Sequence, residues 1–178
     1  ETGTVPESDG FFHISANDVA LINEKFSKRK IMRKHLKSFF NFKYGIHNLR
    51  TFLSLPYSGF IGFYNQHLIM PYAKEDFKMA YSLFSREFEK TWEHRFREPS
   101  DVNEWLVRYL RNITGNFKPG FLRGDFATLS DFENGYPKIS KKSKVLVIND
   151  DGNLNEKIVD NINRFCLQKF PEKSKYEK

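Results

Sequence analysis

The sequence predicts an α/β protein that is rich in helix and has a small sheet. Apolar residues recur at three- and four-residue steps over long stretches, which is the pattern of a helix with one buried face. One short apolar, β-branched run, from Lys144 to Ile148, has the composition of a buried strand. This strand leads directly to Asn149 and Asp150, and it needs neighbouring strands to form a sheet.

The residue pattern in the first third of the sequence predicts short helices. Ser15 or Asn17 is a suitable cap for a first helix. Residues 25–37 hold seven Lys and Arg residues between apolar residues at helical spacing, so we expect a helix with a solvated basic face. Contact of that face with a membrane surface or a nucleic acid is the functional alternative. A further short helix is expected over residues 49–55, and residues 56–72 read as a strand or an irregular loop.

The remaining two thirds alternate between helix and loop. Residues 74–92 have the clearest helical periodicity in the chain. Residues 116–143 are polar and rich in turn residues, so we expect a loop. A last helix is predicted from about 154 to 169, ending before Pro171.

The segment from His94 to Tyr109 concentrates charged and polar residues ahead of an apolar helical face. Pro99 suits the first turn of that helix. If residues 94–97 are extended, Arg95 and Arg97 point to the same side. Two guanidinium groups beside the free N–H groups of a helix start would form an anion site. Surface ion pairs with Glu98 or Asp101 are the commoner interpretation of such a pattern.

Composition excludes some classes of function but does not identify one. The chain has 178 residues, a net charge of +7 and one cysteine, Cys166. The charge favours an anionic partner, which could be a nucleic acid, an acidic membrane surface or a phosphorylated small molecule. A single cysteine excludes an internal disulfide framework. The sequence has no apolar run long enough for a transmembrane helix and no signal-peptide pattern.

Two residues outside the central segment are candidates for chemistry. His67 lies among apolar residues, where a histidine is usually structural, but its side chain could also move a proton. Asp150 follows the predicted strand, and in α/β proteins ligand-binding residues gather at strand carboxyl ends. An acidic residue there often holds a divalent cation that bridges phosphates, although Asp151-Gly152 could equally be a plain turn. A Gly-rich phosphate loop, a Cys/His metal pattern and a nucleophile elbow are all absent from the sequence.

Several motifs in order resemble the Stealth family of sugar-phosphate transferases. The segment His94-Arg95-Phe96-Arg97, followed by Asp101-Val102-Asn103 and Trp105-Leu106, is similar to the family's third conserved block. Gln66-His67 with Pro71 looks like the opening of that block. The other motifs are Lys43-Tyr44-Gly45-Ile46, Asn48-Leu49-Arg50-Thr51, Val147-Ile148-Asn149-Asp150, and Phe170-Pro171-Glu172-Lys173-Ser174 with Tyr176-Glu177. Together the motifs cover about residues 40–178.

The resemblance implies transfer of a sugar 1-phosphate from a nucleotide sugar, expected to be a UDP-sugar, to a hydroxyl of a saccharide acceptor. The product would be a phosphodiester link in a capsular or cell-surface polysaccharide. By the same resemblance His67 is the candidate base, Arg50 and Arg97 bind phosphate, and Asp150 faces the donor or a divalent cation, Mg or Mn. The other residues expected to bind substrate are Lys43, His94, Arg95, Asp101, Asn103 and Asn149.

The family's first two blocks, including an Asn-Asp-Asp element after a strand, are not in this sequence. Residues 1–178 are therefore expected to be a single domain or the C-terminal portion of a larger transferase domain. The missing N-terminal part, or a second chain, would complete the sheet and the site. The expected location is the cytoplasm, at the inner face of a bacterial membrane, with the Golgi lumen as the alternative for a eukaryotic protein.

The alternative to a transferase is a protein of a different class. It would be a basic module that binds nucleic acid or another anionic surface without catalysis. No recognition motif of such a module is present, and the basic residues cluster on one predicted helix, so we expect no nucleic-acid partner. Nucleic-acid binding would weaken steeply with salt, whereas a nucleotide-sugar site would weaken much less.

Overall fold

The structure is a computed structural model that describes residues 10–64, 68–120, 122–172 and 175. The chain divides into two compact units, Glu1–Asn65 with Pro71–Phe121, and Gln66–Met70 with Leu122–Lys178. As predicted, the protein is rich in helix and has a small parallel sheet. No helix in the described ranges combines the length and the apolar character needed to cross a membrane.

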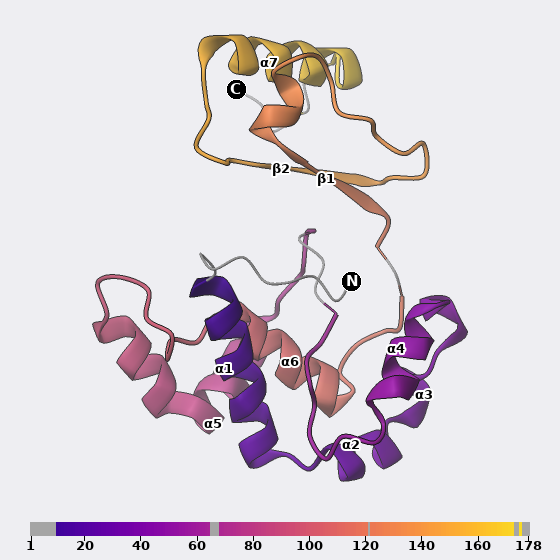
Figure 1. Cartoon of the computed structure of the whole chain (residues 1–178), viewed down its shortest axis with the longest axis vertical. Helices are drawn as coiled ribbons and strands as arrows, with labels where there is room; N and C mark the ends of the chain where they lie inside the picture. Colours follow the sequence, from indigo (N-terminus) through magenta and orange to yellow (C-terminus); the bar gives the residue numbers. More distant parts are fainter. Residues whose placement is uncertain (1–9, 65–67, 121, 173–174, 176–178) are drawn as a thin grey trace. The chain divides into compact units, whose positions relative to one another are not determined.

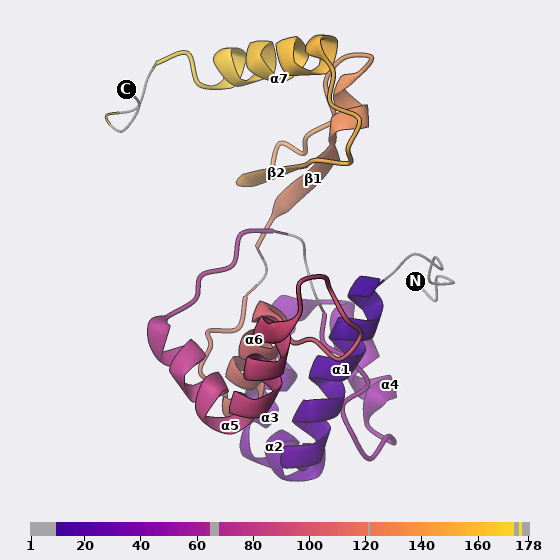
Figure 2. The same ribbon diagram turned by 90° about the vertical axis from the view of Figure 1, so that its left-hand side faces the viewer.

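The first unit is helical (Figure 1). Its elements in chain order are α1 (Gly10–Lys25), α2 (Lys28–Lys34), α3 (Leu36–Phe39), η1 (Phe42–Tyr44), α4 (His47–Ser54), α5 (Lys74–Glu93) and α6 (Glu104–Thr114). α6 packs between α1 and α5 (Figures 1 and 2). The core of the unit therefore forms around α6.

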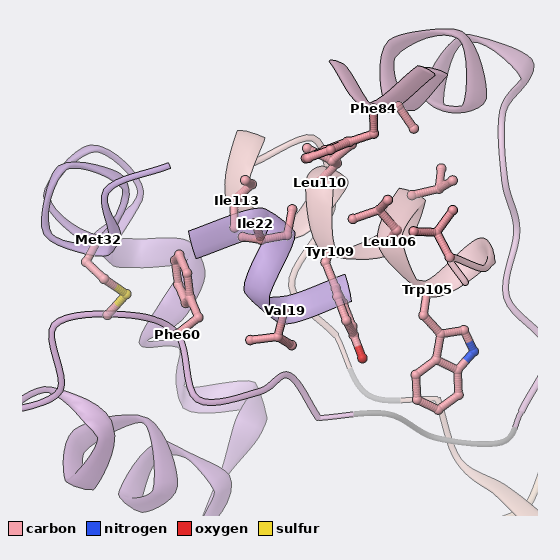
Figure 3. Packing of buried hydrophobic residues seen from close by; sticks show 13 residues of the cluster. Val19, Ile22, Met32, Phe60, Phe84, Trp105, Leu106, Tyr109, Leu110 and Ile113 are labelled. Carbon is pink, nitrogen blue, oxygen red and sulfur yellow. The ribbon is translucent and has the colours of Figure 1, made fainter. Parts of the chain in front are cut away.

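The apolar stripe of α6 explains why this helix lies at the centre. Six of its eleven residues are buried, and they are Trp105, Leu106, Val107, Tyr109, Leu110 and Ile113. All six belong to one apolar cluster with Val19 and Ile22 of α1 and Phe84 of α5, and Figure 3 shows Tyr109 beside Val19, Ile113 beside Ile22 and Leu110 beside Phe84. The Asn103 side chain accepts a hydrogen bond from the backbone N–H of Trp105 and caps the helix. Gly115 ends it in the left-handed conformation, with φ 73°.

Several helix boundaries differ from the prediction. Ser15 and Asn17 lie inside α1 rather than at its start. Their polar atoms bond to groups far along the chain, and Ser15 reaches the Tyr109 hydroxyl at 3.1 Å. The basic stretch 25–37 is divided among the end of α1, α2 and α3, and His35, with φ −120° and ψ 30°, interrupts the helix between α2 and α3. The described part of 56–72 contains no strand.

The second unit is a two-stranded parallel sheet packed against a helix. β1 (Gly124–Thr128) pairs with β2 (Val145–Asn149) over their full lengths, and the register places Gly124 opposite Val145. η2 (Leu129–Phe132) and α7 (Glu156–Lys169) complete the unit. Its small core consists of Ala127, Leu129, Phe132, Ile158 and Phe165, with Cys166 partly buried against them.

The prediction of a loop over residues 116–143 is wrong, because β1 and η2 lie within that stretch. β2 therefore pairs with a strand of this chain, β1, and does not depend only on strands from the family's N-terminal blocks. Gly124 stands at the start of β1, where there is little room for a side chain. A Cβ atom there would come within 2.8 Å of both terminal methyl groups of Leu68. The glycine looks like a turn signal in sequence but allows a close approach between two segments.

Asp18 on α1 is the most unusual polar residue of the first core. Its side chain is 0% exposed, and neither carboxyl oxygen has a hydrogen-bond partner among the residues that the structure describes. Burial raises the pKa of Asp18 from 3.8 to about 8, and the charge of Glu104 adds to this effect. The backbone N–H of Asn103 lowers the pKa in part, without reaching hydrogen-bond geometry. Asp18 is therefore a neutral acid in the folded protein at pH 7.

We expect Asp18→Asn to stabilise the protein at neutral pH. The unfolded carboxyl releases its proton near pH 3.8 while the folded one keeps it to about pH 8. Stability contributed by this group therefore falls as pH rises between these values, by about 1.4 kcal/mol per pH unit. Asn cannot ionise, so Asp18→Asn should gain roughly 2–4 kcal/mol at pH 7 and little at pH 4.

Urea unfolding at pH 4, 5.5 and 7 measures this difference. Asp160→Asn is the matched control, because Asp160 is an exposed carboxyl on a helix. Parallel stability curves for wild type and Asp18→Asn would show that Asp18 is ionised in the folded state.

Candidate active site

The segment between α5 and α6 is organised by Asp101, whose side chain is buried. One carboxyl oxygen lies 2.6 Å from Nδ1 of His94, the residue that follows α5. The other accepts a hydrogen bond from the backbone N–H of Glu98 at 2.8 Å. The backbone N–H of Asp101 donates in return to the carbonyl of Glu98. The segment 94–101 is therefore a closed bend with a carboxylate at its base.

The bend is also fixed from outside. The Asn17 side chain of α1 donates to the carbonyl oxygens of Ser100 and Asp101, at 2.9 and 3.1 Å. The Thr91 hydroxyl accepts a hydrogen bond from the backbone N–H of Val102 at 3.0 Å. These contacts tie the bend to α1 and to the end of α5, so the polar groups on it are held in one arrangement.

The electrostatics of Asp101 favour its ionised form. Burial raises its pKa, but the N–H of Glu98, the hydrogen bond with His94 and the charge of Arg97 together lower it below the ordinary value. An ionised Asp101 attracts the positive groups around it. Arg97 is one of these groups, so its position on the bend is coupled to Asp101.

The arginines of the bend face solvent. Arg95 and Arg97 are exposed, and the Arg95 guanidinium lies 5.4 Å from the centre of the Phe96 ring. The backbone bends at Arg95 and Phe96, so residues 94–97 are not an extended strand and the alternation expected for Arg95 and Arg97 does not hold. Two exposed guanidinium groups on a fixed bend still offer bidentate donors to a phosphate.

The expectation for Pro99 is also wrong. Pro99 lies in a turn, and α6 begins at Glu104. The amide of Trp105, at the helix start, donates to the Asn103 side chain instead of to an anion. Asn103, expected to bind substrate, has a structural role as the helix cap.

Lys43 and Arg50 are placed elsewhere in the first unit. Lys43 is in η1 and Arg50 is in α4, and both side chains are exposed. In Figure 1, α4 lies on the opposite side of the first unit from α5 and from the bend that follows it. The structure therefore does not bring Lys43 and Arg50 together with Arg95 and Arg97.

In the second unit, polar residues gather where the two parallel strands end. Thr128 and Asn149 are the paired last residues of β1 and β2. Asp150 follows Asn149, is exposed, and accepts a hydrogen bond from the backbone N–H of Gly152 at 2.8 Å. The adjacent Asp151 accepts a bond from the Ser130 hydroxyl, also at 2.8 Å. The loops after the two strands are thus joined to each other.

Sequence analysis missed the residues that follow β1. Asp131 accepts hydrogen bonds from the backbone N–H and the hydroxyl of Thr128, at 2.7 and 3.0 Å. The hydroxyl of Ser130 holds the pKa of Asp151 below its usual value. The pair Thr128 and Asp131 has the spacing of a capping box, which is a signal that the sequence does carry.

A divalent cation needs about six oxygen ligands. Among the residues that the structure describes, no group of three or more His, Cys, Asp or Glu side chains could hold a metal ion. Asp150 and Asn149 can supply only part of such a ligand set. Nucleotide phosphates or other residues would have to supply the rest.

Some of the predicted site lies outside the described residues. His67, the candidate base, is one such residue, and so is its neighbour Gln66. The closing motif is described only as far as Glu172, and again at Lys175, so the predictions for Lys173, Ser174, Tyr176 and Glu177 are not addressed.

Comparison with known proteins adds to this geometry. Residues 66–107 match the model of Stealth protein CR3, conserved region 3, a range that contains His67, His94, Arg97 and Asp101. A capsular polysaccharide phosphotransferase, WcwK of Streptococcus pneumoniae, is 33% identical over 98% of this chain and 53% of its own length. No solved structure matches the chain.

Two further relatives cover a similar span. An exopolysaccharide phosphotransferase, cps2G of Lactiplantibacillus plantarum, is 31% identical over 100% of this chain and 54% of its own length. A receptor polysaccharide phosphotransferase, WefC of Streptococcus gordonii, is 31% identical over 96% of this chain and 53% of its own length. The chain spans about half the length of the relatives it matches.

Proposed function

This chain belongs to the Stealth family through its conserved region 3, and from that premise we propose that it is one part of a sugar-phosphate transferase. The enzyme moves a sugar 1-phosphate from a nucleotide sugar to a hydroxyl of a saccharide acceptor. The product is a phosphodiester link in a capsular or cell-surface polysaccharide. The observation that carries the proposal is the similarity, over nearly the whole chain, to proteins named polysaccharide phosphotransferases.

The proposed reaction is a substitution at phosphorus. The acceptor oxygen attacks the β-phosphorus of the donor, the bond from that phosphorus to the bridging oxygen breaks, and a nucleoside monophosphate leaves. The acceptor hydroxyl loses its proton, and His67 is the proposed base. Charge on the transferring group must be offset by positive groups. Arg97 is the proposed ligand of the transferring phosphate, whereas Arg50, the other arginine expected to bind phosphate, lies apart from it on α4.

The bend geometry supports the role of Arg97. Asp101 and Asn17 fix the backbone of the bend next to Arg97, so the side chain of Arg97 extends from a fixed point. A preorganised donor needs less reordering when charge develops on phosphate. His94 and Asp101 are therefore proposed to act mainly by positioning, while Arg95, Lys43 and Asn149 are proposed to contact the substrates.

A divalent cation, Mg or Mn, is part of the proposal. Asp150 would hold it, with donor phosphates and other residues of the longer protein completing the ligand set. When bound, the cation supplies positive charge to the diphosphate.

A UDP-sugar is the proposed donor, and the part of the enzyme not in this sequence, or a second chain, is proposed to complete the site. The proposed location is the cytoplasm, at the inner face of a bacterial membrane.

The products distinguish this reaction from ordinary glycosyl transfer. We expect the full-length enzyme to release UMP from a UDP-sugar and to move a β-phosphate label into the saccharide. Glycosyl transfer would release UDP and leave the label on the nucleotide. The assay uses UDP-glucose, UDP-galactose and UDP-N-acetylglucosamine labelled at the β-phosphate, with a mixture of disaccharide acceptors. Chromatography separates the labelled products.

Chelation is the internal control for the cation. EDTA should stop UMP release, and added Mg or Mn should restore it. Release of UDP as the nucleotide product, with unlabelled saccharide, would contradict the proposed function whatever the metal requirement.

A further inference from the structure

α4 has its polar and apolar faces reversed. An ordinary surface helix turns its apolar residues to the core and its polar residues to water. In α4 the partly covered side chains are His47, Asn48, Thr51 and Ser54, all polar. The exposed ones include Leu49 at 55%, Phe52 at 61% and Leu53 at 62%, and no residue of the helix is buried.

Specific polar contacts hold this reversed helix in place. The Asn48 amide donates to the carbonyl of Asn41 at 2.8 Å, which fixes the start of the helix. Lys28, whose pKa burial lowers, donates through Nζ to the carbonyl oxygens of Ser54, the last residue of the helix, and of Tyr57 beyond it. Through these bonds the polar face of α4 is attached to the neighbouring segments of the first unit. The apolar face is therefore presented outward by the fold.

Exposed apolar residues continue on both sides of the helix. Phe42 is 86% exposed and Ile46 is 80% exposed ahead of it, and Tyr57 is 58% exposed after it. We define the α4 surface as Phe42, Ile46, Leu49, Phe52, Leu53 and Tyr57. Large apolar groups gathered in one segment mark a site of interaction with protein or membrane, since isolated exposed apolar residues are commonplace but such groups are not.

The segment of sequence that carries the α4 surface has charges of one sign. Residues 25–74 contain ten Lys and Arg residues and no Asp or Glu. The rest of the chain then holds 29 − 10 = 19 basic and 22 acidic residues, so the whole positive excess comes from this segment. Arg29, Lys30, Arg33 and Lys34 of α2 and Arg50 of α4 are all exposed.

We propose that the α4 surface docks this protein on an anionic lipid bilayer. Leucine and phenylalanine side chains enter the boundary between headgroups and acyl chains, while the lysines and arginines around them pair with anionic headgroups. A nucleic acid would satisfy the charges but leave the apolar face in water. A protein partner would need an apolar patch inside an acidic rim, whereas an anionic bilayer offers both features at any position. The inference stands on this surface and does not rest on the proposed reaction.

The test is co-sedimentation with vesicles, without donor or acceptor, so that its outcome is separate from that of the transfer assay. The purified protein is mixed with phosphatidylcholine vesicles that either contain or lack phosphatidylglycerol. We expect binding only to the anionic vesicles, and weaker binding as salt rises. The double variant Phe52→Ser, Leu53→Ser should bind at least about tenfold more weakly, because it removes the inserted apolar groups.

Two matched controls come from the second unit. Leu167 and Phe170 are 66% and 73% exposed, so Leu167→Ser with Phe170→Ser removes similar apolar surface elsewhere. Lys141→Glu with Lys142→Glu makes the same charge change as Arg33→Glu with Lys34→Glu, and all four side chains are exposed. Only the variants near α4 should lose vesicle binding. Circular dichroism confirms that each variant is folded.

Three outcomes would overturn the proposal. The first is no binding to anionic vesicles, and the second is unchanged binding by Phe52→Ser, Leu53→Ser. The third is a concentration-dependent dimer, seen by light scattering, that this double variant abolishes while vesicles bind neither protein. That last result would assign the α4 surface to a protein interface.

Discussion

Arg97→Ala is expected to lower sugar-phosphate transfer by the full-length enzyme by about 10³-fold, the size of effect seen when a positive group is removed from a transferring phosphate. Arg97 is exposed on the bend between α5 and α6, where its guanidinium can reach a substrate. Arg97 is an exposed side chain, so the folded state should persist when it is replaced. The loss should therefore appear in the rate and not in the melting temperature.

Arg97→Lys should recover little of this activity. A lysine ammonium keeps the positive charge but cannot make two parallel hydrogen bonds to a phosphate. The charge of Arg97 also helps to lower the pKa of Asp101, and a lysine would preserve that effect. Comparing the two variants therefore separates phosphate binding from support of the bend.

Arg86→Ala is the matched control, because Arg86 is an exposed arginine on α5, ahead of the bend. It should leave the rate of UMP release near that of wild type. Wild-type turnover in Arg97→Ala, or equal losses in Arg86→Ala, would remove the case for Arg97 as a phosphate ligand.

The elements that sequence analysis predicted well are those defined by their own periodicity. α5 was expected over 74–92 and is observed as Lys74–Glu93, because its apolar residues recur regularly along the whole length. β2 was expected over 144–148 and is observed as Val145–Asn149. Both patterns are local, so neither depends on where the rest of the chain goes.

β1 was not predictable in the same way. Its five residues, Gly124 to Thr128, lie in a stretch rich in turn residues and carry only one large apolar side chain. The strand forms because β2 and Leu68 come against it, and those contacts link segments far apart in sequence. Weak local preference is easily overridden by tertiary contacts.

The candidate site also contains both residues that the sequence could identify and residues that it could not. Motif resemblance identified His94, Arg97 and Asp101, which lie together on the bend. It did not identify Asn17, whose amide holds the backbone of that bend from 84 positions away along the chain. Nor did it show that Asp18, one residue on, is buried and has no hydrogen-bond partner in the described part of the chain. Side chains that position a site act through folding, so a motif cannot reveal them.

His67→Gln is expected to abolish nearly all transfer while leaving donor binding intact. Glutamine can keep a hydrogen bond of similar length but cannot accept the acceptor hydroxyl's proton, so a loss of about 10²–10⁴-fold is expected for a general base. Isothermal titration with the UDP-sugar that proves active should give the same affinity for wild type and variant. His13→Gln, at an exposed histidine of α1, is the control.

The pH profile gives the independent evidence for a base. A histidine must be neutral to accept a proton, so the transfer rate should fall as pH drops below about 6.5, where an ordinary imidazole becomes charged. The small residual activity of His67→Gln should lack this acidic fall, because the titrating group is gone. If His67→Gln instead lost donor binding and kept the wild-type profile, His67 would be structural, and the base would have to be another residue of the longer enzyme.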